Sequence, residues 1–251
     1  VLRNARRDKA KGVRFARVTS GRNTCAFCLM LAGRGAVYWS RESAGAFNEW
    51  HRHCTCKVVP SYSGDRWETL VEGHDPRAIH DRLRQVEELS GTKYGTKEFT
   101  DEVELRDPDW LFGDEIDFAV TDGAEPDEYE MEAARLMSEA GIKATFQPRS
   151  LRYKDRRADT LVNDNKWEFK NPQGNGKLTV YNQFKSVVFG ANKHERNPQA
   201  DSLVLSNVRS QMTFEKMIAD SKSVLASGEF PEVVNVLVVS DDGRLRLIKK
   251  S

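Results

Sequence analysis

Two carboxylates and a lysine are spaced along the C-terminal half of this 251-residue chain as they would be on a β-hairpin. Asp159 precedes a stretch rich in Asn and Asp, and Glu168 and Lys170 follow it. If residues 164 and 165 form a two-residue turn, antiparallel pairing sets Asp159 opposite Lys170. Side chains alternate along a strand, so all three charged groups then emerge on one side of the hairpin. The other side requires burial and carries Thr160, Val162, Trp167 and Phe169.

This set of side chains suits the hydrolysis of a phosphodiester bond. The two carboxylates supply hard oxygen ligands, so Asp159 and Glu168 are candidate ligands of a catalytic Mg²⁺ or Mn²⁺. Such a metal lowers the pKa of a bound water molecule, while the Lys170 ammonium orients the nucleophile or stabilises the pentacovalent state. The competing interpretation is an ordinary cross-strand ion pair on a solvated strand face.

The elements that must position these groups alternate between helices and strands. Apolar side chains recur at helical spacing in three segments, over residues 126–140, 178–189 and 213–225. Strand-like patterns occur in six segments, over residues 142–147, 157–162, 166–170, 202–205, 233–239 and 244–248. The order α-β-β-β-α-β, followed by α-β-β, predicts an α/β (α+β) domain with a central mixed sheet.

Asp159 and Glu168-x-Lys170, set on a hairpin after a helix with Glu130 and Glu132, resemble the PD-(D/E)xK nuclease superfamily. The predicted order of elements is similar to the restriction-endonuclease-like core of that superfamily. The resemblance implies a metal-dependent nuclease in which the catalytic residues are Glu130, Asp159, Glu168 and Lys170, with Glu130 preferred over Glu132. A carboxylate in the first turn of a helix also stabilises that helix through its dipole, which is the alternative role for both glutamates.

The same region is similar to the C-terminal toxin domain of contact-dependent inhibition proteins. The similarity rests on the run from Glu130 to Gly141, on Glu168-Phe169-Lys170, on Gln199-Ala200-Asp201, and on Ala158 before the aspartate. The superfamily pattern has proline at that last position, but the metal-binding position itself is unchanged. Members of this toxin family cleave tRNA, so the resemblance implies an RNA substrate with tRNA first. A cognate immunity protein is a further candidate partner.

Four basic side chains indicate where a nucleic acid would lie. Each stands in or beside the predicted helix over residues 178–189, and they are Lys177, Lys185, Lys193 and Arg196. Cations at such positions bind phosphates through charge, so we expect them to flank the substrate. A solvated basic face with no ligand is the alternative.

All four cysteines fall into two close pairs, Cys25-x-x-Cys28 and Cys54-x-Cys56. Two such pairs suit a structural Zn²⁺ held by four thiolates, with His51 as the alternate ligand. A site closed by four thiolates has no vacant position for catalysis. Disulfides are the alternative, and they need an oxidising compartment.

The cysteine region resembles the minor head proteins of actinobacterial tailed phages, which are related to the Mu F-like family. The resemblance rests on Cys25-Ala26-Phe27-Cys28, on Val37-Tyr38, and on the run from His51 to Pro60. It implies a structural zinc element in a protein of the phage portal or capsid. Portal and capsid proteins are therefore expected partners, and the virion head or the bacterial cytoplasm is the expected location.

Composition divides the chain into three parts. Residues 1–90 form a zinc-binding module with a helix from Pro76 to Leu89, residues 91–125 form an acidic connector, and residues 126–251 form the nuclease domain. No apolar run approaches the roughly 20 residues that span a membrane. The first 22 residues are predicted to form a basic helix that suits a polyanion or an acidic protein surface, or is merely solvated. Its cations are Arg3, Arg6, Arg7, Lys9, Lys11, Arg14, Arg17 and Arg22.

We therefore expect a phage or prophage head-associated effector with a divalent-metal-dependent nuclease at its C-terminal end. Because the chain begins with Val1 rather than Met, we expect it to be a piece of a longer protein. One alternative is a non-catalytic, zinc-stabilised capsid or portal adaptor that binds nucleic acid or protein, and a second is a DNA endonuclease of the same fold. A third is a zinc-centred nuclease of the His-Cys type, with His51 or His53 as general base.

Overall fold

The structure is a computed structural model, and the residues that it describes are 12–19, 24–45, 56–62, 71, 73–148, 158–190 and 195–250. The chain divides into two compact units. The first comprises residues 1–87, 93–104 and 108–114, and the second comprises residues 88–92, 105–107 and 115–251. Neither unit is therefore one continuous stretch of chain.

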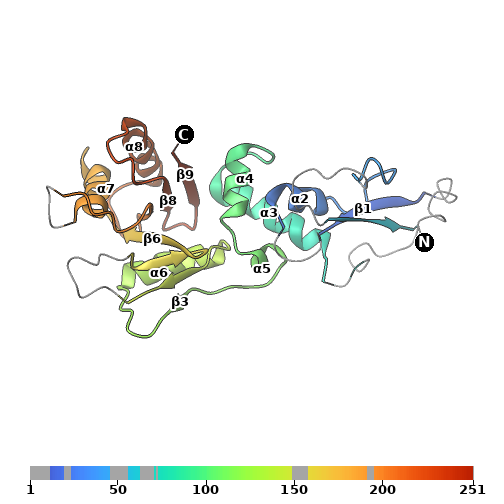
Figure 1. The fold of residues 1–251 in the computed structure, drawn as a ribbon, viewed down its shortest axis with the longest axis horizontal. Helices are drawn as coiled ribbons and strands as arrows, with labels where there is room; N and C mark the ends of the chain where they lie inside the picture. The colour runs from blue at the N-terminus through green and yellow to red at the C-terminus, as the bar shows by residue number, and fades with distance from the viewer. Residues whose placement is uncertain are drawn as a thin grey trace. The chain divides into compact units, whose positions relative to one another are not determined.

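The second unit is built on a mixed sheet of seven strands in the order β3-β4-β5-β6-β7-β8-β9 (Figure 1). Its strands are β3 (Ala119–Val120), β4 (Ala144–Phe146), β5 (Thr160–Val162), β6 (Asn165–Lys170), β7 (Ser202–Ser206), β8 (Asn235–Val239) and β9 (Leu245–Lys249). The three strands β6, β7 and β8 run parallel, as do β3 and β4, while the remaining neighbours are antiparallel. The sequence-predicted mixed α/β sheet is confirmed.

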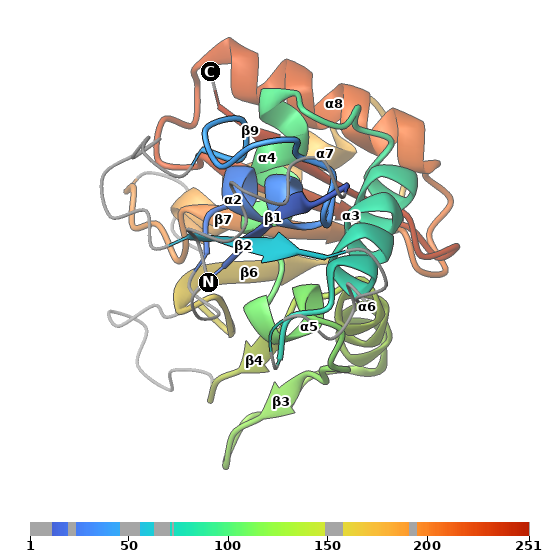
Figure 2. The same cartoon turned by 90° about the vertical axis from the view of Figure 1, so that its right-hand side faces the viewer.

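Three helices cover the two faces of this sheet, α6 (Glu128–Glu139) on one and α7 (Thr179–Phe189) with α8 (Phe214–Ser227) on the other (Figure 2). Trp167 and Phe169 point to the α6 face, where they pack with Leu136 and Met137 in one buried cluster. On the other face, Leu203 and Leu205 of β7 pack against α7 and α8. All three helices begin and end within a few residues of their predicted bounds, because each carries one apolar stripe.

The β5–β6 hairpin differs from its predicted register by two residues. Its turn is Asn163-Asp164 rather than residues 164 and 165, with φ angles of 49° and 61°, and Leu161 therefore pairs with Lys166. Asn and Asp tolerate this left-handed conformation, which a two-residue hairpin turn requires at both positions. Since the two registers differ by two residues, the predicted facing of each side chain is preserved.

Short upstream segments belong to the second unit, which forms hydrogen bonds to their main-chain groups. Arg246 donates from Nη1 to the carbonyl of Ser90 (3.0 Å), and the Asn163 side-chain amide donates to the carbonyl of Leu105 (3.0 Å). The backbone N–H of Asp107 donates to the carbonyl of Gly141 (2.7 Å). These bonds join residues 88–92 and 105–107 to the strands and helix of the same unit.

The acidic stretch over residues 91–125 is more structured than a connector. It contains α4 (Lys97–Glu104), α5 (Pro108–Leu111) and β3. Phe99, Val103 and Trp110 are buried, whereas most of the carboxylates in this stretch lie toward solvent. Each of these elements is too short to show a convincing apolar period in the sequence.

The first unit pairs β1 (Arg14–Val18) with β2 (Lys57–Ser61) in an antiparallel ribbon, beside α2 (Ala26–Ala32) and α3 (Pro76–Ser90). The predicted helix from Pro76 to Leu89 is confirmed as α3, and its predicted face of Ile79, Leu83 and Val86 is buried. The basic N-terminal helix is wrong over residues 14–18, which form β1 instead, because Phe15 also bonds to Tyr38 and Arg17 is buried. Residues 1–11 lie outside the described part of the chain. No described helix combines the length and the apolar character needed to cross a membrane.

Candidate active site

Asp159 and Glu168 approach each other at the start of the β5–β6 ladder. Thr160 pairs with Trp167, and continuing this register by one residue sets Asp159 opposite Glu168. The backbone N–H of Phe169 donates to Asp159 Oδ1 (3.3 Å), the Thr160 hydroxyl donates to the same oxygen (3.2 Å), and the backbone N–H of Asp159 points to Glu168 Oε2 (3.5 Å). Both carboxylates are buried, with 7% and 2% of the residue exposed.

Lys170 is the cation that the structure brings to this pair. Its Nζ donates to Glu168 Oε1 at 2.6 Å, and both side chains emerge on the same face of β6. Lys170 was predicted to lie opposite Asp159, but in the observed register its contact is Glu168 on its own strand. Lys170 is partly exposed, so it joins the buried carboxylates to the surface of the site.

Burial raises the pKa of Asp159 to about 7, and the neighbouring charge of Glu168 adds to this effect. Lys170 and the backbone N–H of Phe169 oppose the increase, while the charge of Glu130 contributes to it. Two carboxylates therefore share this site with one lysine. Their charges are incompletely compensated by the protein itself, which is typical of positions that bind a cation or transfer a proton.

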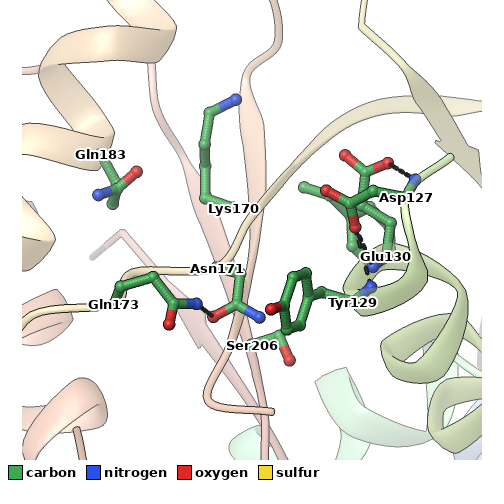
Figure 3. A pocket seen from close by; sticks show the side chains of 9 residues that line it. Asp127, Tyr129, Glu130, Lys170, Asn171, Gln173, Gln183 and Ser206 are labelled. Atoms are coloured by element: carbon green, nitrogen blue, oxygen red, sulfur yellow. Dashed lines mark hydrogen bonds between the residues drawn. The ribbon is translucent and has the colours of Figure 1, made fainter. Parts of the chain in front are cut away.

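A cavity of about 480 Å³ opens beside this group (Figure 3). Lys170 lines it from the end of β6 and Glu130 from the start of α6, whereas Asp159 and Glu168 are not among its lining residues. The other lining residues are Asp127, Tyr129, Phe169, Asn171, Gln173, Gln183 and Ser206. The cavity lies where β6 and β7 end, which is where parallel strands commonly present functional groups.

Glu130 and Glu132 have different surroundings. Asp127 accepts from the backbone N–H of Glu130 (2.8 Å), and Glu130 Oε2 accepts from the backbone N–H of Asp127 (2.9 Å), which forms a capping box at the start of α6. Glu132 instead forms an ion pair with Arg209 at 3.5 Å. Glu130 thus has both the structural role that was the alternative and a place in the cavity wall, and Glu132 does not line the cavity.

The four predicted phosphate-binding cations do not form one described cluster. Lys177 is exposed before α7 and Lys185 is half-buried on it, while Lys193 lies outside the described residues. Arg196 donates to both carboxylate oxygens of Glu232 (2.7 and 2.8 Å) and to the carbonyl of Glu229 (2.9 Å). Its guanidinium is therefore engaged at the surface, and phosphate binding by Lys177, Lys185, Lys193 and Arg196 stays a prediction.

Sequence reasoning did not single out Tyr129, Gln183 or Arg209. Tyr129 is hidden among acidic neighbours in the first turn of α6, and Gln183 reads as an ordinary polar position on an amphipathic helix. Arg209 lies in the loop after β7, far along the chain from the hairpin, so no local pattern connects it with the site. The fold alone brings these three residues to the cavity or its neighbours.

Three of the four cysteines lie in the described part of the first unit, namely Cys25, Cys28 and Cys56. Cys25 caps α2 by accepting from the backbone N–H of Cys28 (3.4 Å). Burial, reinforced by hydrogen bonds with the Cys56 and Cys25 side chains, raises the pKa of the Cys28 thiol. The three sulfur atoms therefore gather from the two predicted pairs. Cys54, His51 and His53 lie outside the described residues.

Within the described ranges, no three His, Cys, Asp or Glu side chains are grouped as a complete set of metal ligands. The partial sets nevertheless have the appropriate chemistry. Asp159 and Glu168 are paired hard oxygen donors with uncompensated charge, as Mg²⁺ or Mn²⁺ requires. The Cys28 thiol is hydrogen-bonded to the Cys25 and Cys56 side chains, and sulfur donors are ligands that Zn²⁺ prefers.

Different known proteins are similar to different parts of the chain. Residues 1–86 match the family model described as VG15 protein. The chain is 33% identical over 81 residues to the Gene 15 protein of Mycobacterium phage D29, and 33% identical over 89 residues to the Gene 15 protein of Mycobacterium phage L5. Each match covers 21% of this chain and 30% of the relative, so the chain spans about a third of these relatives' length.

One solved structure is similar to a larger part of the chain. It is a chain of the CdiA-CT/CdiI toxin and immunity complex from Burkholderia pseudomallei, with a TM-score of 0.38 and 15% sequence identity. The similarity covers 52% of this chain and 98% of that chain. A likeness at this level supports no statement about activity.

Proposed function

We propose that the second unit hydrolyses phosphodiester bonds of nucleic acid in a reaction that depends on a divalent metal. The observation that carries the proposal is the pair of buried carboxylates, Asp159 and Glu168, with Lys170 bonded to Glu168 at 2.6 Å beside a cavity. A buried pair of like charges with one lysine is costly unless a cation or a proton completes it. The pair is therefore better explained by binding of a cation or a proton than by a contribution to stability.

The residues of the site have separable roles in this proposal. Asp159 and Glu168 would hold Mg²⁺ or Mn²⁺, which supplies charge neutralisation at the phosphate and a water molecule of lowered pKa when it is bound. Lys170 lines the cavity and presents its ammonium where it can orient the attacking water or stabilise charge on the phosphate. Glu130 faces the same cavity from α6 and adds negative charge near Asp159.

RNA is the proposed substrate, with tRNA first and DNA as the alternative. The choice of RNA rests on the motif resemblance to contact-dependent inhibition toxins. DNA stays the alternative because many members of the wider superfamily cut DNA. A cognate immunity protein is the corresponding proposed partner. We propose for the first unit a head-associated role in a phage or prophage, on the similarity of residues 1–86 to phage proteins. Its cysteines, Cys25, Cys28, Cys54 and Cys56, would hold a structural Zn²⁺, with His51 as the alternate ligand.

The nuclease proposal is tested by incubating the full chain with tRNA, total RNA and plasmid DNA, each in Mg²⁺ or in EDTA. We expect cleavage in Mg²⁺ and none in EDTA. We expect Glu168→Gln and Asp159→Asn each to lower the cleavage rate by at least about 100-fold, because each removes one ligand charge. Lys170→Ala should lower kcat more than it raises KM. Lys170→Arg should not restore kcat, since a broad guanidinium does not replace a compact ammonium.

Glu139→Gln is the matched control for these variants. Glu139 lies at the end of α6, is more than half exposed and pairs with Arg135 on the same helix. Its replacement should leave cleavage unchanged. If Glu168→Gln degrades tRNA and DNA at the wild-type rate in Mg²⁺, the active site has been misassigned, and the non-catalytic adaptor becomes the better interpretation.

A further inference from the structure

Arg209 lies beside the candidate active site in the loop that follows β7. Its guanidinium carbon is 5.5 Å from the centre of the Tyr129 ring, and Tyr129 is part of the cavity wall. Its nitrogen atoms lie 3.3 Å from Glu128 and 3.5 Å from Glu132, both on α6. The side chain is 58% exposed, so the guanidinium is open to solvent next to the cavity.

These contacts are too weak to explain the arginine as a structural tie. Both ion pairs are longer than the usual charge-assisted hydrogen bond, and Glu128 is 63% exposed. Ion pairs in such surroundings contribute little to stability because water and salt screen them. Exchanging either glutamate for another anion would therefore cost the protein little.

The backbone of Arg209 is held in a conformation that it would not choose by itself. Its φ is 53°, which is in the left-handed region that L-amino acids with long side chains rarely occupy. Two bonds fasten the loop on both sides, since Asn171 donates to the carbonyl of Val208 (2.9 Å) and the Ser210 hydroxyl donates to the carbonyl of Pro172. Asn171 directly follows Lys170, so the loop is fixed to the strand end that carries the candidate catalytic lysine. Such strain persists where the surrounding structure imposes it, and often at functional sites.

We infer that Arg209 binds a phosphate of the nucleic-acid backbone next to the cavity, and that it exchanges Glu128 and Glu132 for that phosphate. The inference rests on the proposed nuclease function and adds a substrate-positioning residue to it. A guanidinium offers a planar, two-pronged donor that matches a phosphate, and the Tyr129 ring beneath it limits its motion. In the absence of substrate, the two glutamates keep the guanidinium next to the site.

The test measures binding of tRNA to the full chain in EDTA, where cleavage does not interfere, over a series of salt concentrations. Arg209→Ala should weaken binding by roughly 10- to 100-fold and should reduce the salt dependence by about one phosphate contact. Arg209→Lys should keep the salt dependence but lose part of the affinity, because an ammonium cannot bind a phosphate with two parallel bonds. Arg135→Ala is the matched control, since Arg135 is a similarly exposed arginine on α6 that pairs with Glu139.

A second measurement separates a binding role from a structural one. Arg209→Gly removes the backbone strain, so thermal unfolding of this variant should occur at the same or a higher temperature while tRNA binding weakens. A structural tie would instead lower both. Glu128→Gln combined with Glu132→Gln should tighten binding, and it should do so more in the presence of Arg209 than in Arg209→Ala.

The outcomes distinguish this inference from the function on which it rests. If wild-type protein cleaves RNA in Mg²⁺ while Arg209→Ala binds tRNA with the affinity and salt dependence of Arg135→Ala, the role of Arg209 is refuted and the nuclease stands. If wild-type protein neither binds nor cleaves RNA or DNA, the proposed function fails and the role of Arg209 fails with it.

Discussion

At the scale of single residues, the Asp159 carboxylate should make the stability of the second unit depend on pH. Its pKa of about 7 lies above the ordinary value of 3.8 for an aspartate, with burial as the main cause and Glu168 next. The folded protein therefore binds this proton more tightly than the unfolded chain does. The resulting stability is fully present below about pH 4 and is lost as the pH rises from there through 7.

Asp159→Asn should consequently stabilise the metal-free protein at high pH. We expect an increase of a few kcal/mol in the free energy of unfolding at pH 8, at about 1.4 kcal/mol for each tenfold change in proton affinity, and little change at pH 4. Urea unfolding in EDTA at the two pH values measures this difference. The exposed Asp122 supplies the control, since Asp122→Asn should have no such effect. Equal stability of Asp159→Asn and wild type at pH 8 would contradict the raised pKa.

The parts of the site that depend on contacts between neighbouring residues could be predicted from the sequence, whereas the parts that depend on distant contacts could not. Alternation along two adjacent strands placed Asp159, Glu168 and Lys170 on one face without knowledge of the fold. Burial of the two carboxylates was not predictable, because β6 is flanked by β7, a strand distant in sequence, in which Leu203 pairs with Glu168. The contact of Arg209 with Tyr129 joins a loop and a helix about 80 residues apart, and no periodicity reports on such a pair.

At the scale of elements, the β5–β6 turn shows the limit of a local argument. The segment Asn163-Asp164-Asn165 offers two overlapping two-residue turns with similar side chains, so the sequence does not choose between them. Asn163 is fixed in the observed turn because its amide also donates to the carbonyl of Leu105. A contact outside the hairpin thus selects its register.

Asp164→Gly should stabilise this hairpin. Asp164 has φ of 61° and is exposed, and glycine adopts that conformation without steric cost. We expect the free energy of unfolding to rise by up to about 1 kcal/mol, with cleavage unchanged. Asp164→Val is the opposing variant and should lower it, because a β-branched side chain is disfavoured at positive φ. Chemical denaturation of the three proteins measures the order, and a Val variant as stable as the Gly variant would exclude a left-handed turn here.

The longer elements were predicted well and the shorter ones were not. Helices α3, α6, α7 and α8 each bury a continuous stripe over at least three turns, which the sequence displays as apolar residues at helical spacing. Strand β3 has two residues and α5 has four, so each sequence contains only about one period, which is too little to show a repeat. Strand β1 was mistaken for part of a helix because its arginines dominate the composition of the N-terminal segment.

At the scale of the whole molecule, the proposal that the two units bind different metals predicts that they unfold in separate steps. If Zn²⁺ joins Cys25, Cys28, Cys54 and Cys56, its removal should lower the unfolding temperature of the first unit only. Calorimetry with a zinc-selective chelator, followed by addition of excess Mg²⁺, measures this. We expect Mg²⁺ to restore cleavage without restoring the earlier transition. Cys25→Ser should reproduce the effect of the chelator.

The corresponding composition is measured on protein purified without chelators. Elemental analysis should give one Zn²⁺ per chain. Protein that lacks zinc but is fully folded, or a disulfide that involves Cys25, would contradict a zinc-stabilised first unit.

The hydrogen bonds to main-chain groups of residues 88–92 and 105–107 affect how this unit could be exchanged between proteins by recombination. Arg246 and Asn163 recognise the carbonyls of Ser90 and Leu105, and Gly141 accepts the N–H of Asp107. Every amino acid supplies a carbonyl, and every one except proline supplies an N–H. These bonds constrain the path of the preceding chain, while its side chains are constrained at Leu89 and Leu105, which pack on the core of the C-terminal unit. Recombination could join this unit to other upstream sequences, provided that the new segment keeps its length, an apolar residue at these two positions and no proline at position 107.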